Sequence, residues 1–156
     1  STAPVPLFTY LRDSDATIHI VGGDARLSLE RARPYGFDLL VLDAFSSDAV
    51  PAHLLTREAV ALYARHLRNA RSLLVIHVSN RYLNLEGVVQ AAGRAAGFST
   101  AQVEDDLVDD DSERTTWMVL ARDPEVLRPF GTALSGAGGP LWTDASSNLL
   151  RVLGRD

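Results

Sequence analysis

The run of apolar residues from Phe37 to Leu42 constrains the fold of this chain more than any other feature. Only Asp38 interrupts the run, which ends at a carboxylate, Asp43, and is followed by a polar turn. A nearly continuous apolar run of this length predicts a strand that is buried on both faces of a parallel sheet. Open α/β sheets bind their ligands at the carboxyl ends of such strands. We therefore expect the chemistry of the chain at Asp43 and at the second carboxylate of the turn, Asp48.

The segments before and after this run alternate between strand and helix patterns. The sequence predicts strands over 17–21, 37–43, 72–78, 98–103 and 115–121, and helices over 25–33, 57–68, 85–96 and about 146–153. This alternation predicts the α/β class, with a Rossmann-like and mostly parallel sheet of about five strands. Because the last two strands are joined by a loop too short for a crossover helix, we expect them to form a C-terminal antiparallel hairpin.

Length and composition limit the classes of function. The 156 residues correspond to one domain over 1–156. The chain has 15 basic and 20 acidic residues, and this net charge of -5 argues against a nucleic-acid-binding face. The absence of cysteine excludes disulfides, thiolate zinc sites and a cysteine nucleophile. No apolar run approaches the roughly 18 residues of a membrane span, so we expect a cytoplasmic chain without direct membrane contact.

Several short motifs follow one another in an order that a known family shares. They are Gly23-Asp24-Ala25-Arg26, the strand from Phe37 to Asp43, Ser46-Ser47-Asp48, the segment from Leu54 to Glu58, Trp142-Thr143-Asp144 and Asn148-Leu149-Leu150. Together they resemble the spermidine synthase family (polyamine aminopropyltransferases), which has the class I S-adenosylmethionine-dependent methyltransferase fold. The likeness is strongest to bacterial spermidine-synthase-like domains that are often attached to a transporter-like membrane segment. It covers the chain from about Phe8 to Leu153.

The resemblance implies a polyamine site at the end of the strand over 37–43. An amine that attacks the carbon next to a sulfonium must first be neutral, and a carboxylate within hydrogen-bond reach can accept its proton. By resemblance, Asp43 is the catalytic base, and Asp48 with Ser46 and Ser47 binds the polyamine substrate. The alternative is that both carboxylates only cap the turn and the short helix after it.

The resemblance also implies contacts to the S-adenosyl substrate, which is decarboxylated S-adenosylmethionine or S-adenosylmethionine itself. Asp24 resembles the acid that accepts a hydrogen bond from the exocyclic amine of adenine, with the backbone of Ala25 beside it. Asp24 also stands where the N-cap of the helix over 25–33 belongs, and an N-cap accepts hydrogen bonds from backbone amides instead. A carboxylate has two oxygens, so one residue can do both. Thr56 stands in the same N-cap position before the helix over 57–68.

Three departures from the family pattern concern these sites. One is that the family's glutamine after the next strand is replaced here by Ser79-Asn80, and the family's amino-terminal hairpin domain is absent. In the family, a glycine-rich loop and the acidic residue that holds the ribose precede the Gly-Asp segment, and this chain has neither. Gly22-Gly23 is not that loop, because it follows the wrong strand. We therefore expect the chain to be the C-terminal portion of a domain and to lack the first two strands of the fold. Asp43 and Asp48 are also farther apart in the sequence than the two carboxylates of the family.

The other reactive residue types give weaker patterns. His77 stands alone in an apolar strand, where a histidine is most often a satisfied core residue. Ser46 and Ser47 have no histidine or lysine arranged around them in the sequence, which argues against a serine hydrolase. No histidine pair has metal-ligand spacing with a carboxylate, so we expect no metal site. The acidic residues from Asp105 to Asp111 predict a solvated hairpin loop.

Two functions remain open from the sequence. The first is aminopropyl transfer in the full-length protein, impaired in this chain. The alternative is a catalytically degenerate domain with an interaction or regulatory role, fused to a transporter-like membrane segment as its cytosolic part. The two missing strands would separate the strand over 17–21 from the strand over 37–43. Either these strands then pair directly or a second copy fills the gap, and we expect a homodimer.

Overall fold

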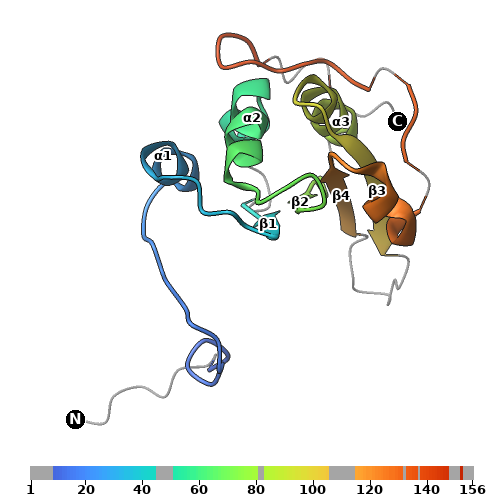
Figure 1. Cartoon of the computed structure of the whole chain (residues 1–156). Helices are drawn as coiled ribbons and strands as arrows, with labels where there is room; N and C mark the ends of the chain where they lie inside the picture. Colours follow the sequence, from blue (N-terminus) through green and yellow to red (C-terminus); the bar gives the residue numbers. More distant parts are fainter. Residues whose placement is uncertain are drawn as a thin grey trace, which may run out of the picture.

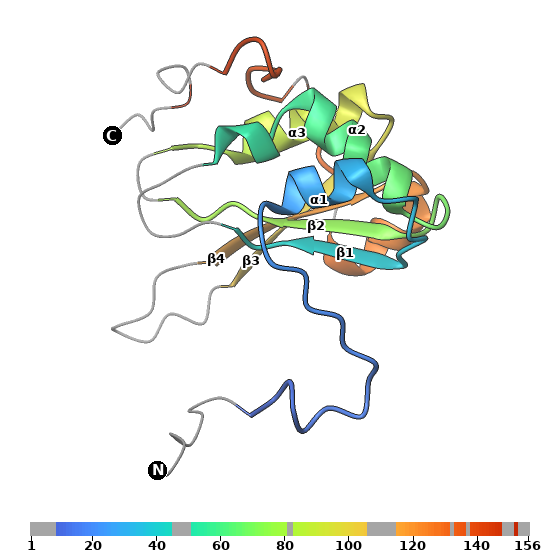
Figure 2. The same cartoon turned by 90° about the vertical axis from the view of Figure 1, so that its left-hand side faces the viewer.

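The computed structural model describes residues 9–44, 51–80, 83–105, 115–131, 133–136, 138–147 and 152. Three helices, α1 (Ala25–Arg31), α2 (Arg57–His66) and α3 (Glu86–Ala95), lie on one face of a sheet (Figures 1 and 2). Two 3-10 segments, η1 (Ala52–Leu54) and η2 (Pro124–Phe130), are also described. None of these helices has both the length and the apolar character needed to cross a membrane.

The sheet is mixed and has four strands in the order β1-β2-β4-β3. The strands are β1 (Leu39–Leu42), β2 (Leu73–His77), β3 (Ser99–Asp105) and β4 (Thr115–Ala121). β1 and β2 are parallel, and β4 is antiparallel to both β2 and β3. The predicted α/β class and the C-terminal hairpin are therefore confirmed, but the described sheet is not the mostly parallel sheet of about five strands that the sequence predicts. It has four strands, and β4 pairs with both of its neighbours in the antiparallel sense. This strand order is compatible with the Rossmann-like methyltransferase fold expected from the sequence.

The predicted first strand does not form. Residues 17–22 belong to no strand, and the first strand of the sheet is β1. Ile20 and Val21 are 78% and 69% exposed, and Figure 1 shows the chain before α1, residues 9–23, running away from the sheet as an arm. The β-branched residues of the arm favour an extended backbone, but a strand also needs a partner to satisfy its hydrogen bonds. The described part of the sheet places no strand beside the arm.

The expectation that the strand over 37–43 is buried on both faces is also wrong. Leu40 and Leu42 face the helices, whereas Leu39 and Val41 are 53% and 48% exposed on the other face. β1 lies at an edge of the sheet, and α1 to α3 cover only one of its faces. On the opposite face, η2 packs on β3 and β4.

Alternation along the strands divides the apolar residues between two cores. Leu74, Ile76 and Leu120 point toward the helices and are fully buried, together with residues of α2 and α3. Val119 and Leu127 belong to a second, smaller core between the sheet and η2. Complete burial of each such side chain stabilises the fold by about 1.5–3 kcal/mol.

Caps that the sequence predicts fix the starts of two helices. Asp24 accepts a hydrogen bond from the backbone N–H of Leu27 at 2.8 Å, and Thr56 accepts one from that of Ala59 at 3.2 Å. Gly97 follows α3 with φ +81°, as expected of a glycine that ends a helix. The helix predicted over 146–153 falls mostly outside the described residues, and Ser146 bridges to Thr143 rather than starting a helix.

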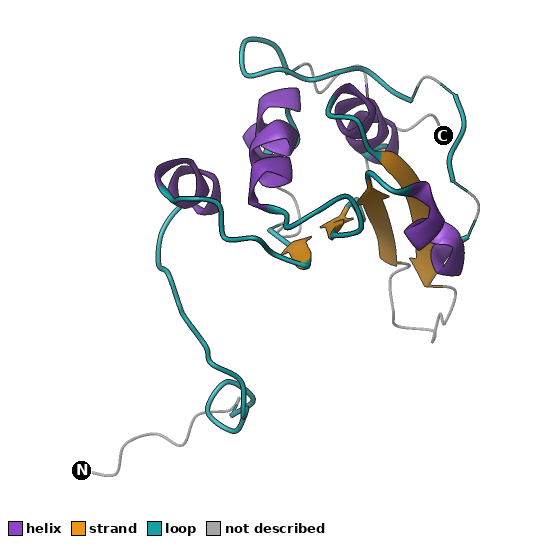
Figure 3. Ribbon diagram, in the orientation of Figure 1, coloured by secondary structure: helices purple, strands orange, loops and turns teal. Residues whose placement is uncertain are grey.

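A C-terminal loop over 138–147, called here the strap, crosses the ends of α2 and α3 (Figure 3). The N–H of Gly139 donates to the carbonyl of Gly87 at 2.7 Å, and the N–H of Arg57 donates to the carbonyl of Trp142 at 2.9 Å. Trp142 is 1% exposed, so it is a core residue. The strap thereby brings Asp144 to the start of α1.

Candidate functional site

Asp43 and His77 meet at the carboxyl ends of the two parallel strands. The register pairs Leu42 of β1 with Ile76 of β2, so the next residue of each strand is Asp43 and His77. The Nδ1 atom of His77 lies 2.9 Å from Oδ1 of Asp43. The side chain of Asp43 is 58% exposed, and that of His77 is 20% exposed. The predicted base is therefore held by a neighbour on one side and remains open to an incoming molecule.

The other ring nitrogen of His77 contacts a serine. Nε2 of His77 lies 2.7 Å from Oγ of Ser79, and the same Oγ accepts the backbone N–H of Thr116 at 2.7 Å. The ring of His77 also stacks on Trp117, with 4.7 Å between centroids. Because a carboxylate only accepts hydrogen bonds, Nδ1 donates to Asp43. In the neutral ring, Nε2 is then the acceptor of the Ser79 hydroxyl proton.

Asp43, His77 and Ser79 together are called the Asp43 cluster below. From the sequence alone, His77 is expected to be a core residue with no connection to Asp43. Two features of the sequence do indicate that these three side chains lie together. His77 and Ser79 are two residues apart at the end of a strand, so their side chains point to the same side. Parallel strands that are adjacent in the sheet also end at the same edge, which brings Asp43 beside His77.

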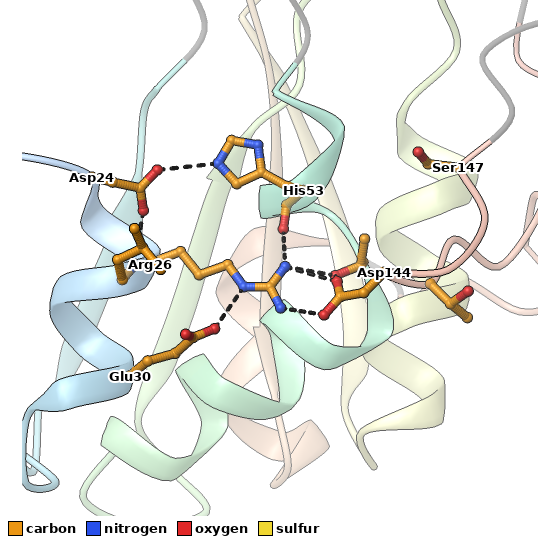
Figure 4. Close-up of a pocket in the computed structure, with 9 residues that line it drawn as sticks. Asp24, Arg26, Glu30, His53, Asp144 and Ser147 are labelled. Atoms are coloured by element: carbon orange, nitrogen blue, oxygen red, sulfur yellow. Dashed lines mark hydrogen bonds and ion pairs between the residues drawn. The ribbon is translucent and has the colours of Figure 1, made fainter.

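Arg26 organises a second group of polar residues at the start of α1 (Figure 4). Its guanidinium donates to both carboxylate oxygens of Asp144, with 2.8 Å between Nη1 and Oδ1, and its Nε lies 3.1 Å from Glu30. The hydroxyl of Thr56 also donates to Asp144, at 2.7 Å. The hydrogen bonds from Arg26, followed by the one from Thr56, lower the pKa of Asp144 to about 2. Arg26, Glu30, Thr56 and Asp144 form the Arg26 cluster.

Asp24 borders a cavity beside this cluster. One oxygen of Asp24 caps α1, and the other lies 3.4 Å from Nε2 of His53. The hydrogen bond from the Leu27 N–H lowers the pKa of Asp24, which keeps the carboxylate ionised. The cavity measures about 400 Å³, and Figure 4 shows Asp24 and His53 on one side of it and Asp144 on another. Ala25, the first residue of α1, follows Asp24 directly.

The remaining predicted site residues cannot be placed beside Asp43. Ser46, Ser47 and Asp48 lie outside the described residues, so their substrate-binding roles stay predictions. Within the described ranges, no group of three or more histidine, aspartate or glutamate side chains is arranged to hold a metal ion.

The similarity of this chain to known proteins is distant. No protein-family model matches it, and no curated protein sequence matches it. Among solved structures it is similar to MnmC2 from Aquifex aeolicus, with a TM-score of 0.46 and 17% sequence identity. The similarity covers 73% of this chain and 37% of the length of the MnmC2 chain. The fold class therefore follows from the strand order and register of the sheet itself.

Proposed function

We propose that this chain is part of a transferase domain that acts on an S-adenosyl substrate. In the longer protein, the reaction is transfer of an aminopropyl group from decarboxylated S-adenosylmethionine to a polyamine. The observation that carries the proposal is the position of Asp43, which lies at the carboxyl end of β1 with a largely exposed carboxylate held by His77. Ligands of open α/β sheets bind at this edge.

The chemistry of the transfer matches a carboxylate in this position. The acceptor nitrogen forms a bond to the carbon next to the sulfonium, the bond from that carbon to sulfur breaks, and methylthioadenosine leaves. The acceptor nitrogen must lose a proton, and Asp43 takes it. His77 keeps one oxygen of Asp43 in place at 2.9 Å, which leaves the exposed part of the carboxylate for the amine.

The residues around Asp24 fit one part of the S-adenosyl substrate. Asp24 lines the cavity of about 400 Å³, and its oxygen that does not cap α1 lies 3.4 Å from Nε2 of His53. A carboxylate oxygen can accept more than one hydrogen bond, so this oxygen can also accept one from the exocyclic amine of adenine. Leu27 supplies an apolar side chain to the same cavity and is 49% exposed. The family holds the ribose with residues that this chain lacks. We therefore expect binding in the millimolar range for this chain alone.

A titration with 5′-methylthioadenosine, followed by ¹⁵N–¹H correlation spectra, tests the proposal. We expect saturable shifts at Asp24, Ala25 and Asp43. The matched variant is Asp24→Asn, because asparagine caps helices as well as aspartate does but presents an amide donor in place of one acceptor oxygen. The variant should bind at least about ten times more weakly, as expected for a lost hydrogen bond to a charged group. Equal binding by both proteins, or shifts centred on η2, would refute the adenine site.

An interaction role is the second candidate, and the uncovered face of β1 supports it. Leu39 and Val41 are about half exposed on this edge strand, and Ile20 and Val21 extend from the same chain as an exposed arm. Residues 17–21 of a second copy, paired with β1, would cover both apolar surfaces and give the homodimer expected from the sequence. Sedimentation velocity distinguishes the outcomes. A dimer that dissociates when Val41 is changed to Lys supports this role, and a monomer at high concentration argues against it.

A further inference from the structure

Asp43, His77 and Ser79 form an acid–histidine–serine series. The carboxylate lies 2.9 Å from Nδ1 of His77, and the serine hydroxyl lies 2.7 Å from Nε2 of the same ring. A nucleophile and its base within about 2.6–3.2 Å, with the base oriented by a third group, are the structural mark of an activated nucleophile. Such a site is recognised by the geometry and roles of its members and not by their order in the sequence.

We propose that the Asp43 cluster activates the Ser79 hydroxyl as a nucleophile toward small activated esters. This function does not depend on the proposed transfer, because it needs no S-adenosyl substrate. The sequence argues only against a serine hydrolase that uses Ser46 or Ser47 as its nucleophile, because neither serine has a base near it in the sequence. Ser79 is a different serine, and the fold supplies the base that sequence spacing alone does not reveal.

Each member of the cluster has a defined part in the reaction. Asp43 holds the tautomer of His77 in which Nε2 carries no proton and can accept one. The backbone N–H of Thr116, 2.7 Å from Oγ of Ser79, stabilises negative charge on that oxygen as its proton leaves. Stacking on Trp117 limits rotation of the imidazole. The ring is thus held from two sides while it moves the proton.

The reaction balances with water as the second substrate. Oγ of Ser79 forms a bond to the carbonyl carbon of the ester, and the hydroxyl proton moves to Nε2 of His77. The bond from that carbon to the leaving oxygen then breaks, and the alcohol departs with the proton from His77. Water attacks the acyl-serine in the same way, which releases a carboxylic acid and restores the Ser79 hydroxyl. Nitrophenyl esters suit the site, because their leaving group departs readily.

A fluorophosphonate probe tests the proposal on the chain as it is. The serine oxygen displaces fluoride from phosphorus, and the adduct is found by mass spectrometry. The tryptic peptide over 72–81 also contains Ser72, so fragmentation must assign the adduct to Ser79. We expect labelling at Ser79 in the wild type and in the control Ser14→Ala, which changes an exposed serine of the arm. Hydrolysis of nitrophenyl acetate should follow the same pattern.

The variant Asp43→Asn decides between an activated serine and one that only caps the end of β2. The variant keeps Ser79 and the hydrogen bond that Ser79 accepts from the N–H of Thr116. The side chain of residue 43 is 58% exposed, so the substitution should leave the fold intact. We expect labelling to slow at least about 100-fold, because asparagine no longer holds His77, the base, in the tautomer that accepts the serine proton. Ser79→Ala should abolish the adduct. Labelling that is absent from the wild type, lies on another residue or is unchanged in Asp43→Asn would overturn the proposal. Binding of methylthioadenosine is measured separately, so either proposal can fail alone.

Discussion

The Asp43 cluster and the Arg26 cluster contain similar residue types but differ in how their hydrogen bonds are used. In the Arg26 cluster, the side chain of Arg26 is 12% exposed, and its donors meet two carboxylates and a backbone carbonyl. In the Asp43 cluster, the carboxylate is 58% exposed, and the series ends at a hydroxyl. Ionic groups that pair with each other hold a fold together, whereas a histidine between an exposed acid and a hydroxyl can move a proton. We therefore expect the Arg26 cluster to stabilise the fold and the Asp43 cluster to carry out chemistry.

Gly87→Ala should give the largest loss of stability, because it lifts the strap that carries Asp144. A Cβ atom on Gly87 would lie 2.8 Å from the backbone nitrogen of Gly139, and neither backbone can yield cheaply. We expect a loss of about 3 kcal/mol in the free energy of unfolding, measured by urea denaturation. Gly22→Ala is the matched control, since nothing lies within 4 Å of its Cβ position. Equal effects of the two substitutions would contradict the role of the strap.

Arg26→Met should cost about 2 kcal/mol, the value for lost hydrogen bonds to charged groups reduced by the partial exposure of Asp144. Methionine keeps the aliphatic packing but removes every donor of the guanidinium. If the two clusters have separate roles, the same variant leaves labelling of Ser79 unchanged. A variant that keeps its stability but loses labelling would reverse the assignment of the two clusters.

Thr56→Ala should cost about 1 kcal/mol, as for the loss of an N-cap hydroxyl. The residue caps α2 through the N–H of Ala59 and also donates to Asp144, so its removal affects both the helix and the Arg26 cluster. Thermal unfolding measures the effect. The substitution Thr56→Ser keeps the hydroxyl and should retain most of the stability that Thr56→Ala loses. If serine is as destabilising as alanine, the hydroxyl of Thr56 does not account for the loss.

The smallest expected effect is the loss of stability at acid pH that follows from protonation of Asp144. The pKa of Asp144 falls from 3.8 to about 2 in the folded chain, so its contribution is complete above pH 3.8 and is lost as the pH falls toward 2. The melting temperatures of the wild type and of Asp144→Asn should therefore differ at pH 6 and converge near pH 2. A difference that stays constant over this range would mean that the Arg26 cluster does not stabilise the ionised carboxylate.

Local sequence signals predict much of this fold, because caps and alternation act over a few residues. Asp24 and Thr56 cap the helices that the sequence assigns to them, and the range of β4 is the predicted one. The arm shows the limit, since its residues favour a strand but the described sheet offers it no partner. The contact between Arg26 and Asp144 spans 118 residues, and no local pattern signals it.

The candidate site also has one part that the sequence predicts and another that only the assembled sheet reveals. Asp43 follows from the position of an apolar run, which the sequence displays directly. Its connection to His77 depends on the parallel register of β1 and β2, and the part played by Ser79 depends on β4 as well. These are properties of the assembled sheet. A histidine near the end of an apolar strand can therefore pair with an acid at the end of the neighbouring parallel strand, even when the two are far apart in the sequence.

Binding of a diamine to Asp43 tests the central claim most directly. Putrescine is titrated into the ¹⁵N-labelled chain with methylthioadenosine present, and the shifts of Asp43 and His77 are compared with those of Asp13 and Asp15, exposed acids of the arm. We predict saturable shifts at Asp43 and His77 that disappear in Asp43→Asn, with only weak, salt-sensitive shifts at the arm. Shifts of equal size at the arm, or shifts that persist in Asp43→Asn, would contradict a polyamine site at the carboxyl end of β1.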